Sequence, residues 1–137
     1  MKKIPCVLTI AGSDPSGGAG IQADIKTFQE LQVYGMSVIT SLTAQNTTGV
    51  QDVYHVPLEM IEQQIKSILN DIPVHAFKTG MLANVDIMEV VARQIKNIDV
   101  PFVMDPVMVA TSGDSLISND ARDYLKENLI LLSTLLT

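Results

Sequence analysis

Short runs of β-branched residues alternate with longer stretches in which apolar side chains recur at helical spacing, and this alternation constrains the fold more than any other feature. The short runs predict strands at 7–11, 36–42, 50–56, 76–79 and 102–105, with a further strand starting within 133–137. The longer stretches predict helices at 20–31, 58–69, 85–98 and 119–131. Strand–helix–strand alternation predicts an α/β fold, with a doubly wound, mostly parallel sheet and flanking helices.

The composition fits one folded domain and excludes several other classes of protein. With 137 residues, of which 47% are hydrophobic and 18% charged, the chain can bury a core and is not a disordered acidic tail. Nine lysines and arginines against fifteen aspartates and glutamates leave a net charge of −6, which argues against generic binding to nucleic acid or to anionic membranes. Cys6 is the one cysteine, so a disulfide framework and a multi-cysteine metal site are excluded. No apolar run approaches the ~20 residues that span a bilayer, and we expect a soluble cytoplasmic protein.

The last predicted strand starts a few residues before Thr137, with no loop or helix after it. A strand in that position leaves an unprotected sheet edge. We therefore expect residues 1–137 to be the N-terminal portion of a longer α/β domain.

The loops that follow the predicted parallel strands differ in composition from the loops at the opposite end of the sheet. Ligands of open parallel sheets bind outside the carboxyl ends of the strands. Glycine, proline and isolated polar residues gather in the four segments at that end, which are 12–20, 44–49, 80–84 and 105–114. The segments 71–75 and 97–101 at the other end are plain connectors. The sequence therefore predicts a ligand site at the carboxyl end of the sheet.

The glycine-rich segment 12–20 stands before the first predicted helix, where backbone amides can approach a ligand closely. It fails the Walker A pattern, because Gly18 and Ala19 stand where that pattern needs lysine and serine or threonine. It satisfies the dinucleotide pattern G-x-G-x-x-A through Gly18, Gly20 and Ala23, but no acidic residue ends the second strand about 20 residues further on. A dinucleotide site and a glycine turn for close strand–helix packing both stay open.

Three polar residues are candidates for binding a ligand. Asp24 falls on the apolar side of its helix, where a carboxylate needs either backbone partners or a ligand. Gln45 follows a strand and carries both a donor and an acceptor, so it either binds a heterocyclic edge or stabilises a turn. Asp105 ends a core strand, which suits either a Mg²⁺ or phosphate site or a cap of the loop.

Other residues capable of chemistry are expected to be structural. His55, in a predicted edge strand or flap, and His75, at the opposite end of the sheet, should be structural or solvent-facing. Cys6 opens a core strand and is expected to pack. Met81 and Met108 are expected to make apolar contacts, in the core or in a pocket wall.

Four sequence blocks carry a family resemblance. The first and most specific is TIAGSDPSGGAGIQAD at 9–24. The others are SVITSLTAQNT at 37–47, KTGML at 78–82, and MDPVM at 104–108 together with SGD at 112–114. In this order the blocks closely resemble the hydroxymethylpyrimidine/phosphomethylpyrimidine kinase family, the thiamine-pathway branch of the ribokinase-like superfamily. A related group with the same blocks consists of pyridoxal kinases.

The resemblance implies a ribokinase-like fold and a phosphotransferase. The family transfers the γ-phosphate of ATP, with Mg²⁺, to the hydroxymethyl group of 4-amino-5-hydroxymethyl-2-methylpyrimidine, and then phosphorylates the monophosphate. By motif position, Gln45 would bond the pyrimidine edge and Asp24 would lie by the hydroxymethyl and amino groups. Asp105 would lie near Mg²⁺ and the ATP phosphates. The pocket around the ring would be lined by Gly12, Ala19, Met81 and Val107.

The resemblance also implies that this chain holds the substrate-binding half of the family fold. The ATP site and the glycine-rich anion hole, with the catalytic residues, would lie beyond Thr137. The 137-residue chain by itself is expected to be inactive, because phosphoryl transfer rests on positioning and electrostatic stabilisation. The full-length protein would be a homo-oligomer, a dimer, with the strand at 50–56 as its flap or dimer edge.

Three alternatives stay open. A pyridoxal kinase comes nearest, because pyridoxal shares the ring size and the hydroxymethyl group. A non-catalytic domain that keeps the pyrimidine pocket is the second. A dinucleotide binder is the third, and it is disfavoured by Thr43-Ala44-Gln45-Asn46 at the end of the second strand, where that fold needs an acid.

Overall fold

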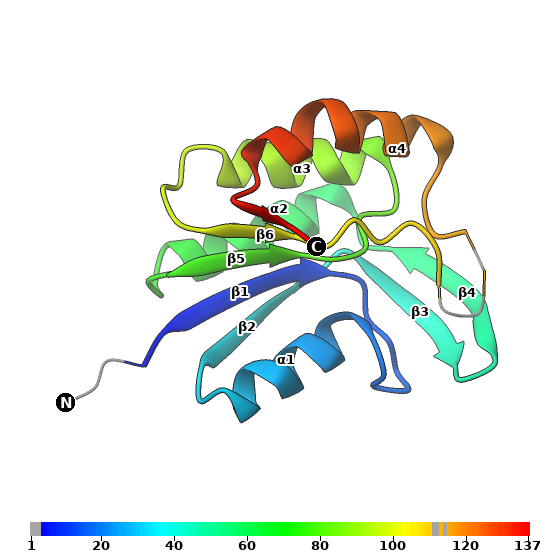
Figure 1. The fold of residues 1–137 in the computed structure, drawn as a ribbon, viewed down its shortest axis with the longest axis horizontal. Coiled ribbons are helices and arrows are strands. Elements are labelled where there is room, and N and C mark those ends of the chain that lie inside the picture. Colours follow the sequence, from blue (N-terminus) through cyan, green and yellow to red (C-terminus); the bar gives the residue numbers. More distant parts are fainter. Residues whose placement is uncertain (1–3, 111–112, 114) are drawn as a thin grey trace.

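Five parallel strands form the central sheet, in the spatial order β2-β1-β5-β6-β7 (Figure 1). The computed structural model describes residues 4–110, 113 and 115–137. The strands of the sheet are β1 (Cys6–Ala11), β2 (Tyr34–Ile39), β5 (Ala76–Thr79), β6 (Phe102–Met104) and β7 (Leu135–Leu136). A separate antiparallel pair, β3 (Ser41–Asn46) and β4 (Gly49–His55), extends beyond the carboxyl end of β2. The predicted α/β fold with a mostly parallel sheet is confirmed.

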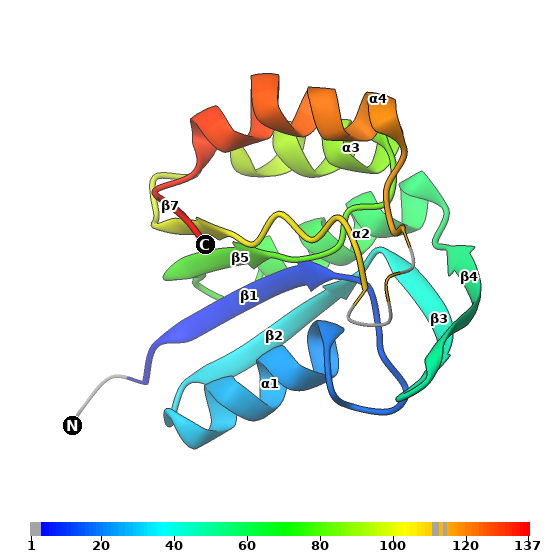
Figure 2. The same cartoon turned by 45° about the vertical axis from the view of Figure 1, so that its right-hand side comes forward.

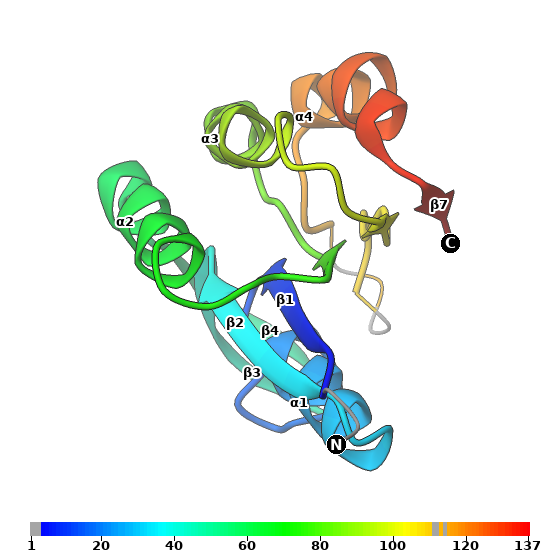
Figure 3. The same cartoon turned by 90° about the vertical axis from the view of Figure 1, so that its left-hand side faces the viewer.

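Helices cover the two faces of the sheet unequally. On one face α1 (Gly20–Glu30) packs against β1 and β2. On the other face lie α2 (Leu58–Leu69), α3 (Val85–Ile95) and α4 (Asn119–Tyr124), as Figure 3 shows. The chain continues from α4 through a π-helical turn at Leu125–Leu129 and a 3₁₀ turn at Ile130–Leu132. The last predicted helix is therefore confirmed, but only its first part is a regular α-helix. In the part of the chain that the structure describes, no helix is long and apolar enough to cross a membrane.

Alternate residues of β1 and β5 point to opposite faces of the sheet, because a strand has a period of two. Leu8, Ile10 and Phe77 are buried in the hydrophobic core with residues of α2 and α3. Thr9 and Lys78 are register partners, and both contact α1 on the other face. The same pair of strands therefore carries the apolar core on one face and polar side chains on the other.

Two predicted helix starts agree with the structure. Asn84 caps α3, where its Oδ1 accepts a hydrogen bond from the Ile87 amide at 2.9 Å. Helix α2 begins directly after Pro57, as proline at a helix start predicts.

The prediction of one strand over 36–42 is wrong, because the chain bends at Thr40. This residue is fully buried between β2 and β3. Its amide donates to the Ala11 carbonyl at 2.9 Å, and its hydroxyl donates to the Met81 carbonyl at 3.1 Å. These bonds hold the bend, so the chain leaves the parallel sheet and forms the β3–β4 hairpin. The strand predicted at 50–56 is β4 of this hairpin, and it starts one residue earlier.

The two edges of the sheet differ in their protection. At the β2 edge, the Gln64 side chain of α2 accepts from the Ile39 amide at 3.0 Å and donates to the Ile39 carbonyl at 3.1 Å, as a neighbouring strand would. At the other edge, β7 pairs in parallel with β6, so the strand predicted within 133–137 is confirmed. Within the described residues, no strand pairs with the outer side of β7. Exposed edges of this kind invite pairing with another chain.

Candidate active site

A cavity of about 650 Å³ lies at the carboxyl end of the sheet, where the sequence predicts the ligand site. Its lining residues belong to the loops after β1, β5 and β6, to the start of α1 and to the tip of the β3–β4 hairpin. Figure 2 shows these segments at the same end of the sheet. All seven residues predicted to bind substrate or metal line this one cavity: Gly12, Ala19, Asp24, Gln45, Met81, Asp105 and Val107. The structure therefore brings together residues that lie far apart in the sequence.

The carboxylate of Asp14 accepts hydrogen bonds from other residues of its own glycine-rich loop, 12–20. Asp14 is 2% exposed, and its Oδ1 accepts from the amide and the hydroxyl of Ser16 at 2.9 and 2.7 Å. Its Oδ2 accepts from the amides of Gly18 and Ala19 at 3.0 and 2.8 Å. Burial by itself would raise the pKa of Asp14, but the hydrogen bonds from Ser16, Ala19 and Gly18 outweigh it and hold the pKa below its usual value.

These contacts decide between the two interpretations of the glycine-rich segment. The amides of Gly18 and Ala19, which a phosphate would need, already bond Asp14. Gly20 has a φ of +57°, and a side chain there would collide with the Gly12 carbonyl oxygen. Gly20 is therefore needed for close packing of the loop against the start of α1. The geometry favours the glycine turn over a dinucleotide site.

Asp24 is held by two side chains at the floor of the cavity. Its Oδ2 accepts from the Thr9 hydroxyl at 2.6 Å and from the Lys78 ammonium at 3.0 Å. The prediction that backbone groups satisfy this carboxylate is wrong, because side chains of β1 and β5 do so. The prediction that Asp24 accepts a hydrogen bond from a ligand agrees with its place in the cavity wall and is taken up below.

Asp105 directly follows β6 and lines the cavity. Its Oδ2 lies 3.8 Å from the Lys78 ammonium, and its side chain is 44% exposed. Among the described residues, no hydrogen bond to its carboxylate caps the loop, so the cap interpretation gains no support. An exposed carboxylate at a strand end can accept a cation.

Gln45 lies inside β3 rather than in a turn. A β-bulge interrupts the β3–β4 register at Ala44/Gln45, and bulges of this kind redirect a side chain. The Thr43 hydroxyl donates to the Ser13 carbonyl at 2.8 Å, and the Gln45 Oε1 lies 3.2 Å from the same hydroxyl oxygen. These bonds connect the hairpin to the loop after β1, so the amide of Gln45 is presented to the cavity from an anchored strand.

The apolar part of the cavity wall includes Met81, which is 8% exposed. The Met81 Cε lies where a side chain on Gly12 would stand, only 2.5 Å from the position of such a Cβ. Gly12 therefore makes room for this thioether. The expected apolar role of Met81 is confirmed as a pocket wall, and that of Met108 as a partly buried contact of the core.

The two histidines and the cysteine make structural contacts, as predicted. His55 Nδ1 lies 2.9 Å from the Ser41 hydroxyl across the hairpin. His75 Nδ1 accepts from the Cys6 amide at 3.0 Å, at the far end of the sheet from the cavity. The Cys6 side chain is partly buried against the core.

Sequence reasoning missed two charged residues of the site. Asp14 precedes a proline and could have been recognised as a turn residue, but its four hydrogen bonds depend on the loop conformation. In the sequence, Lys78 stands out only as part of the KTGML block. A lysine inside a buried strand is itself a signal, because such a charge needs a partner. The motif residues Ser112 and Asp114 lie outside the described residues.

The charges of the cavity bear on whether Mg²⁺ would fit. Among the residues that the structure describes, no cluster of three or more histidine, cysteine or acidic side chains could hold a metal ion alone. Mg²⁺ in kinases is usually bound by one or two carboxylates together with substrate phosphates. Asp105 supplies one such carboxylate in the cavity wall, so the residues fit a metal that arrives with a nucleotide.

The fold and the cavity define the class of the protein as ribokinase-like, and comparisons with known proteins give the family. A crystal structure of phosphomethylpyrimidine kinase from Clostridium difficile 630 matches with a TM-score of 0.90 and 45% identity, over 98% of this chain and 58% of that chain. The structure of pyridoxal kinase from Staphylococcus aureus in complex with pyridoxal matches with a TM-score of 0.87 and 36% identity, over 98% of this chain and 50% of that chain.

The family model described as phosphomethylpyrimidine kinase matches residues 14–137, and the chain belongs to this family. The hydroxymethylpyrimidine/phosphomethylpyrimidine kinase of Bacillus subtilis (strain 168) is 53% identical over 131 residues, which are 95% of this chain and 48% of that protein. The chain thus spans about half the length of the curated relatives that it matches.

Proposed function

We propose that this chain forms the substrate-binding half of a hydroxymethylpyrimidine/phosphomethylpyrimidine kinase. The reaction is ATP-dependent phosphorylation of 4-amino-5-hydroxymethyl-2-methylpyrimidine, followed by phosphorylation of its monophosphate. One observation carries the proposal: a single cavity gathers Asp24, Gln45 and Asp105 around an apolar wall. Membership of the family supports the activity, since its named relatives are kinases of this type.

Each side of the cavity has a proposed part in binding the pyrimidine. The Gln45 amide, which has both a donor and an acceptor, bonds the heterocyclic edge. The Asp24 carboxylate accepts hydrogen bonds from the hydroxymethyl or amino group. The ring lies against the wall formed by Gly12, Ala19, Met81 and Val107.

The phosphoryl donor is proposed to enter from the Asp105 side of the cavity. The family uses ATP, and the Staphylococcus aureus pyridoxal kinase has been crystallised with ADP and with AMP-PCP. Asp105 would hold a Mg²⁺ ion, which neutralises phosphate charge when it is bound. We propose that the ATP site and the catalytic base belong to the half of the relatives that these 137 residues do not match, and that the full-length protein is a dimer.

A pyridoxal kinase is the second candidate. The observation in its favour is the close structural match to the Staphylococcus aureus enzyme in complex with pyridoxal. Pyridoxal also carries a hydroxymethyl group on a six-membered ring, so the same cavity could accept it. A binding domain without turnover is the remaining alternative.

Calorimetric titration of the 137-residue chain with hydroxymethylpyrimidine and with pyridoxal tests the proposal. We expect the pyrimidine to bind more tightly, and Gln45→Ala to weaken it about tenfold or more, because a buried ligand acceptor or donor loses its partner. Gln63→Ala is the matched control, since that glutamine lies on the exposed side of α2. Preference for pyridoxal would select the second candidate. Binding of neither ligand would contradict both.

A further inference from the structure

Lys78 lies within the central strand β5, and its ammonium reaches two carboxylates of the cavity. The Nζ atom is 3.0 Å from Asp24 Oδ2 and 3.8 Å from Asp105 Oδ2. The lysine side chain is 19% exposed. A lysine so far from solvent is normally paired, and both partners here belong to the proposed site.

The pairing with Asp24 uses only one of its two oxygens. Thr9 and Lys78 are register partners on neighbouring strands, so their side chains reach α1 side by side. Both donate to Oδ2, at 2.6 and 3.0 Å. Among the described residues, none donates a hydrogen bond to Oδ1. The carboxylate is therefore fixed through one oxygen, and the other is free to accept from a ligand in the cavity.

The contact with Asp105 is looser. At 3.8 Å it is an ion pair beyond hydrogen-bond distance, and the Asp105 side chain is more exposed than that of Asp24. Lys78 therefore donates a hydrogen bond to Asp24, whereas it interacts with Asp105 only through a longer ion pair. This arrangement leaves the Asp105 carboxylate available for a cation.

A neighbouring glycine gives the ammonium its space. A Cβ on Gly80 would lie 2.9 Å from the Lys78 Nζ and 3.1 Å from the Cβ of Ala11. A side chain at this position would therefore displace the ammonium. Gly80 thus leaves the ammonium room in its present position.

We propose that Lys78 is a positioning residue for substrate binding, an inference that rests on the proposed function. With Thr9, it holds Asp24 so that Oδ1 faces the hydroxymethyl or amino group of the pyrimidine. Its charge also offsets the repulsion between Asp24 and Asp105 as they meet a ligand from two sides. Thr9 is fully buried and does not line the cavity, so it acts on a ligand only through Asp24.

The test is calorimetric titration of hydroxymethylpyrimidine into the 137-residue chain and its variants. We expect Lys78→Met to weaken binding about tenfold, as loss of a charge-assisted hydrogen bond does, and Lys78→Arg to restore part of the affinity. Thr9→Val, which keeps the shape of the buried side chain, should weaken binding several-fold. Lys96→Met is the matched control at the opposite end of the sheet and should bind like the wild type.

A double-mutant cycle separates positioning from direct contact. If Lys78 acts through Asp24, the Asp24→Asn/Lys78→Met variant should bind no more weakly than Asp24→Asn, whereas additive losses would mean that Lys78 touches the ligand and would overturn the proposal. Wild-type affinity in both Lys78→Met and Thr9→Val would also overturn it. If Lys78→Met does not fold, Thr9→Val decides. Failure of the wild type to bind either ring compound would instead overturn the proposed function, and this inference with it.

Discussion

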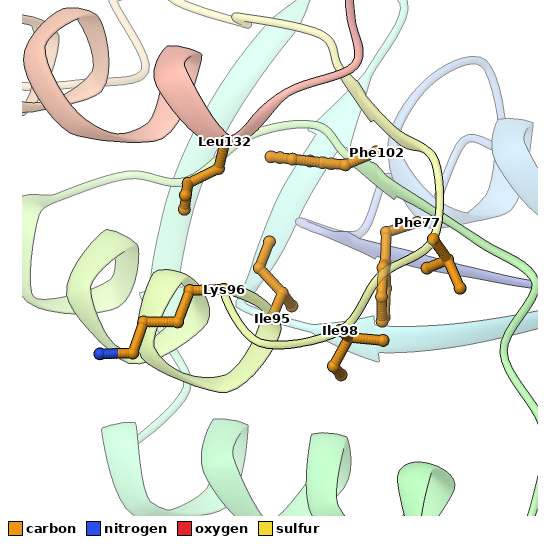
Figure 4. A pocket seen from close by; sticks show the side chains of 7 residues that line it. Phe77, Ile95, Lys96, Ile98, Phe102 and Leu132 are labelled. Atoms are coloured by element: carbon orange, nitrogen blue, oxygen red, sulfur yellow. The ribbon is translucent and has the colours of Figure 1, made fainter.

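Two cavities at opposite ends of one sheet show how this fold separates stability from function. The larger, about 650 Å³, lies at the carboxyl end and is lined by carboxylates, amides and glycines. The smaller, about 50 Å³, lies at the amino end (Figure 4). Its lining is apolar except for one lysine and consists of Phe77, Ile95, Lys96, Ile98, Val100, Phe102 and Leu132. In Figure 4 the ammonium of Lys96 points away from the apolar side chains.

The two cavities share strand β5. Phe77 lines the small cavity, and the next residue, Lys78, lines the large one. Successive residues of a strand point to opposite faces of the sheet. Phe77 can therefore pack in the core while Lys78 faces the ligand cavity. At about 50 Å³ the small cavity is far below the size of a small-molecule site, and it lies at the margin of the core, where buried Phe77 meets exposed Lys96 and Leu132. Substitutions there should change stability, and substitutions in the large cavity should change ligand affinity.

The largest expected effect is that of Phe77→Ala. Phe77 is 1% exposed, and its removal enlarges the small cavity and costs about 3–5 kcal/mol of unfolding free energy. Denaturant unfolding followed by circular dichroism measures this change. A loss of less than about 1 kcal/mol would contradict the expectation that side chains at the small cavity stabilise the fold.

A smaller loss is expected for Asp14→Asn. The amide keeps one acceptor but cannot accept from all of its donors, so the loop after β1 should lose about 1–3 kcal/mol. The variant should also bind the pyrimidine more weakly, because this loop forms the cavity wall. Unchanged stability and affinity would contradict the role assigned to the carboxylate.

The same carboxylate predicts a dependence on pH. The pKa of Asp14 is lowered in the folded chain from its ordinary value of 3.8, so its stabilising contribution is complete above that value and is lost as pH falls below it. Between pH 5 and pH 2 the wild type should therefore lose more stability than Asp14→Asn. Parallel unfolding free energies for the two proteins across this range would contradict the prediction.

The smallest expected effect is a gain of up to about 1 kcal/mol for Val100→Ile, which adds one methylene beside the small cavity. Ligand affinity should not change, because the substitution lies at the end of the sheet opposite the large cavity. A thermal melt and one titration measure both quantities. A change in ligand affinity would show that packing at the small cavity affects binding at the large one, so the two ends of the sheet would not be independent.

The sequence predicts elements well where local pattern decides them. The strand at 76–79 has the same bounds as β5, and α3 begins at Val85 as predicted. The bend at Thr40 could not be predicted, because it depends on hydrogen bonds to Ala11 and Met81, which lie far away in the sequence.

For the site, too, local pattern predicts some features, and contacts between distant residues decide others. Glycine and proline content after the strands indicates where the cavity lies, since this follows from topology. The partners of its charges do not follow from local pattern: Lys78 meets Asp24 across 54 residues of sequence. The chemistry of the residues pointed to Asp24, Gln45, Asp105 and Met81. The resemblance added Gly12, Ala19 and Val107, and neither source gave a role to Asp14 or Lys78.

The large cavity should bind the pyrimidine, and the small cavity should not, because it is too small for the ring. Titration of the ¹⁵N-labelled chain with hydroxymethylpyrimidine, followed by amide chemical shifts, tests it most directly. The account predicts saturable shifts at the cavity residues Gly18, Thr47 and Gly80, and none at Lys96, Ile98 and Val100. Shifts centred on the second group, or no shift at any amide of the first group at saturating ligand, would contradict it.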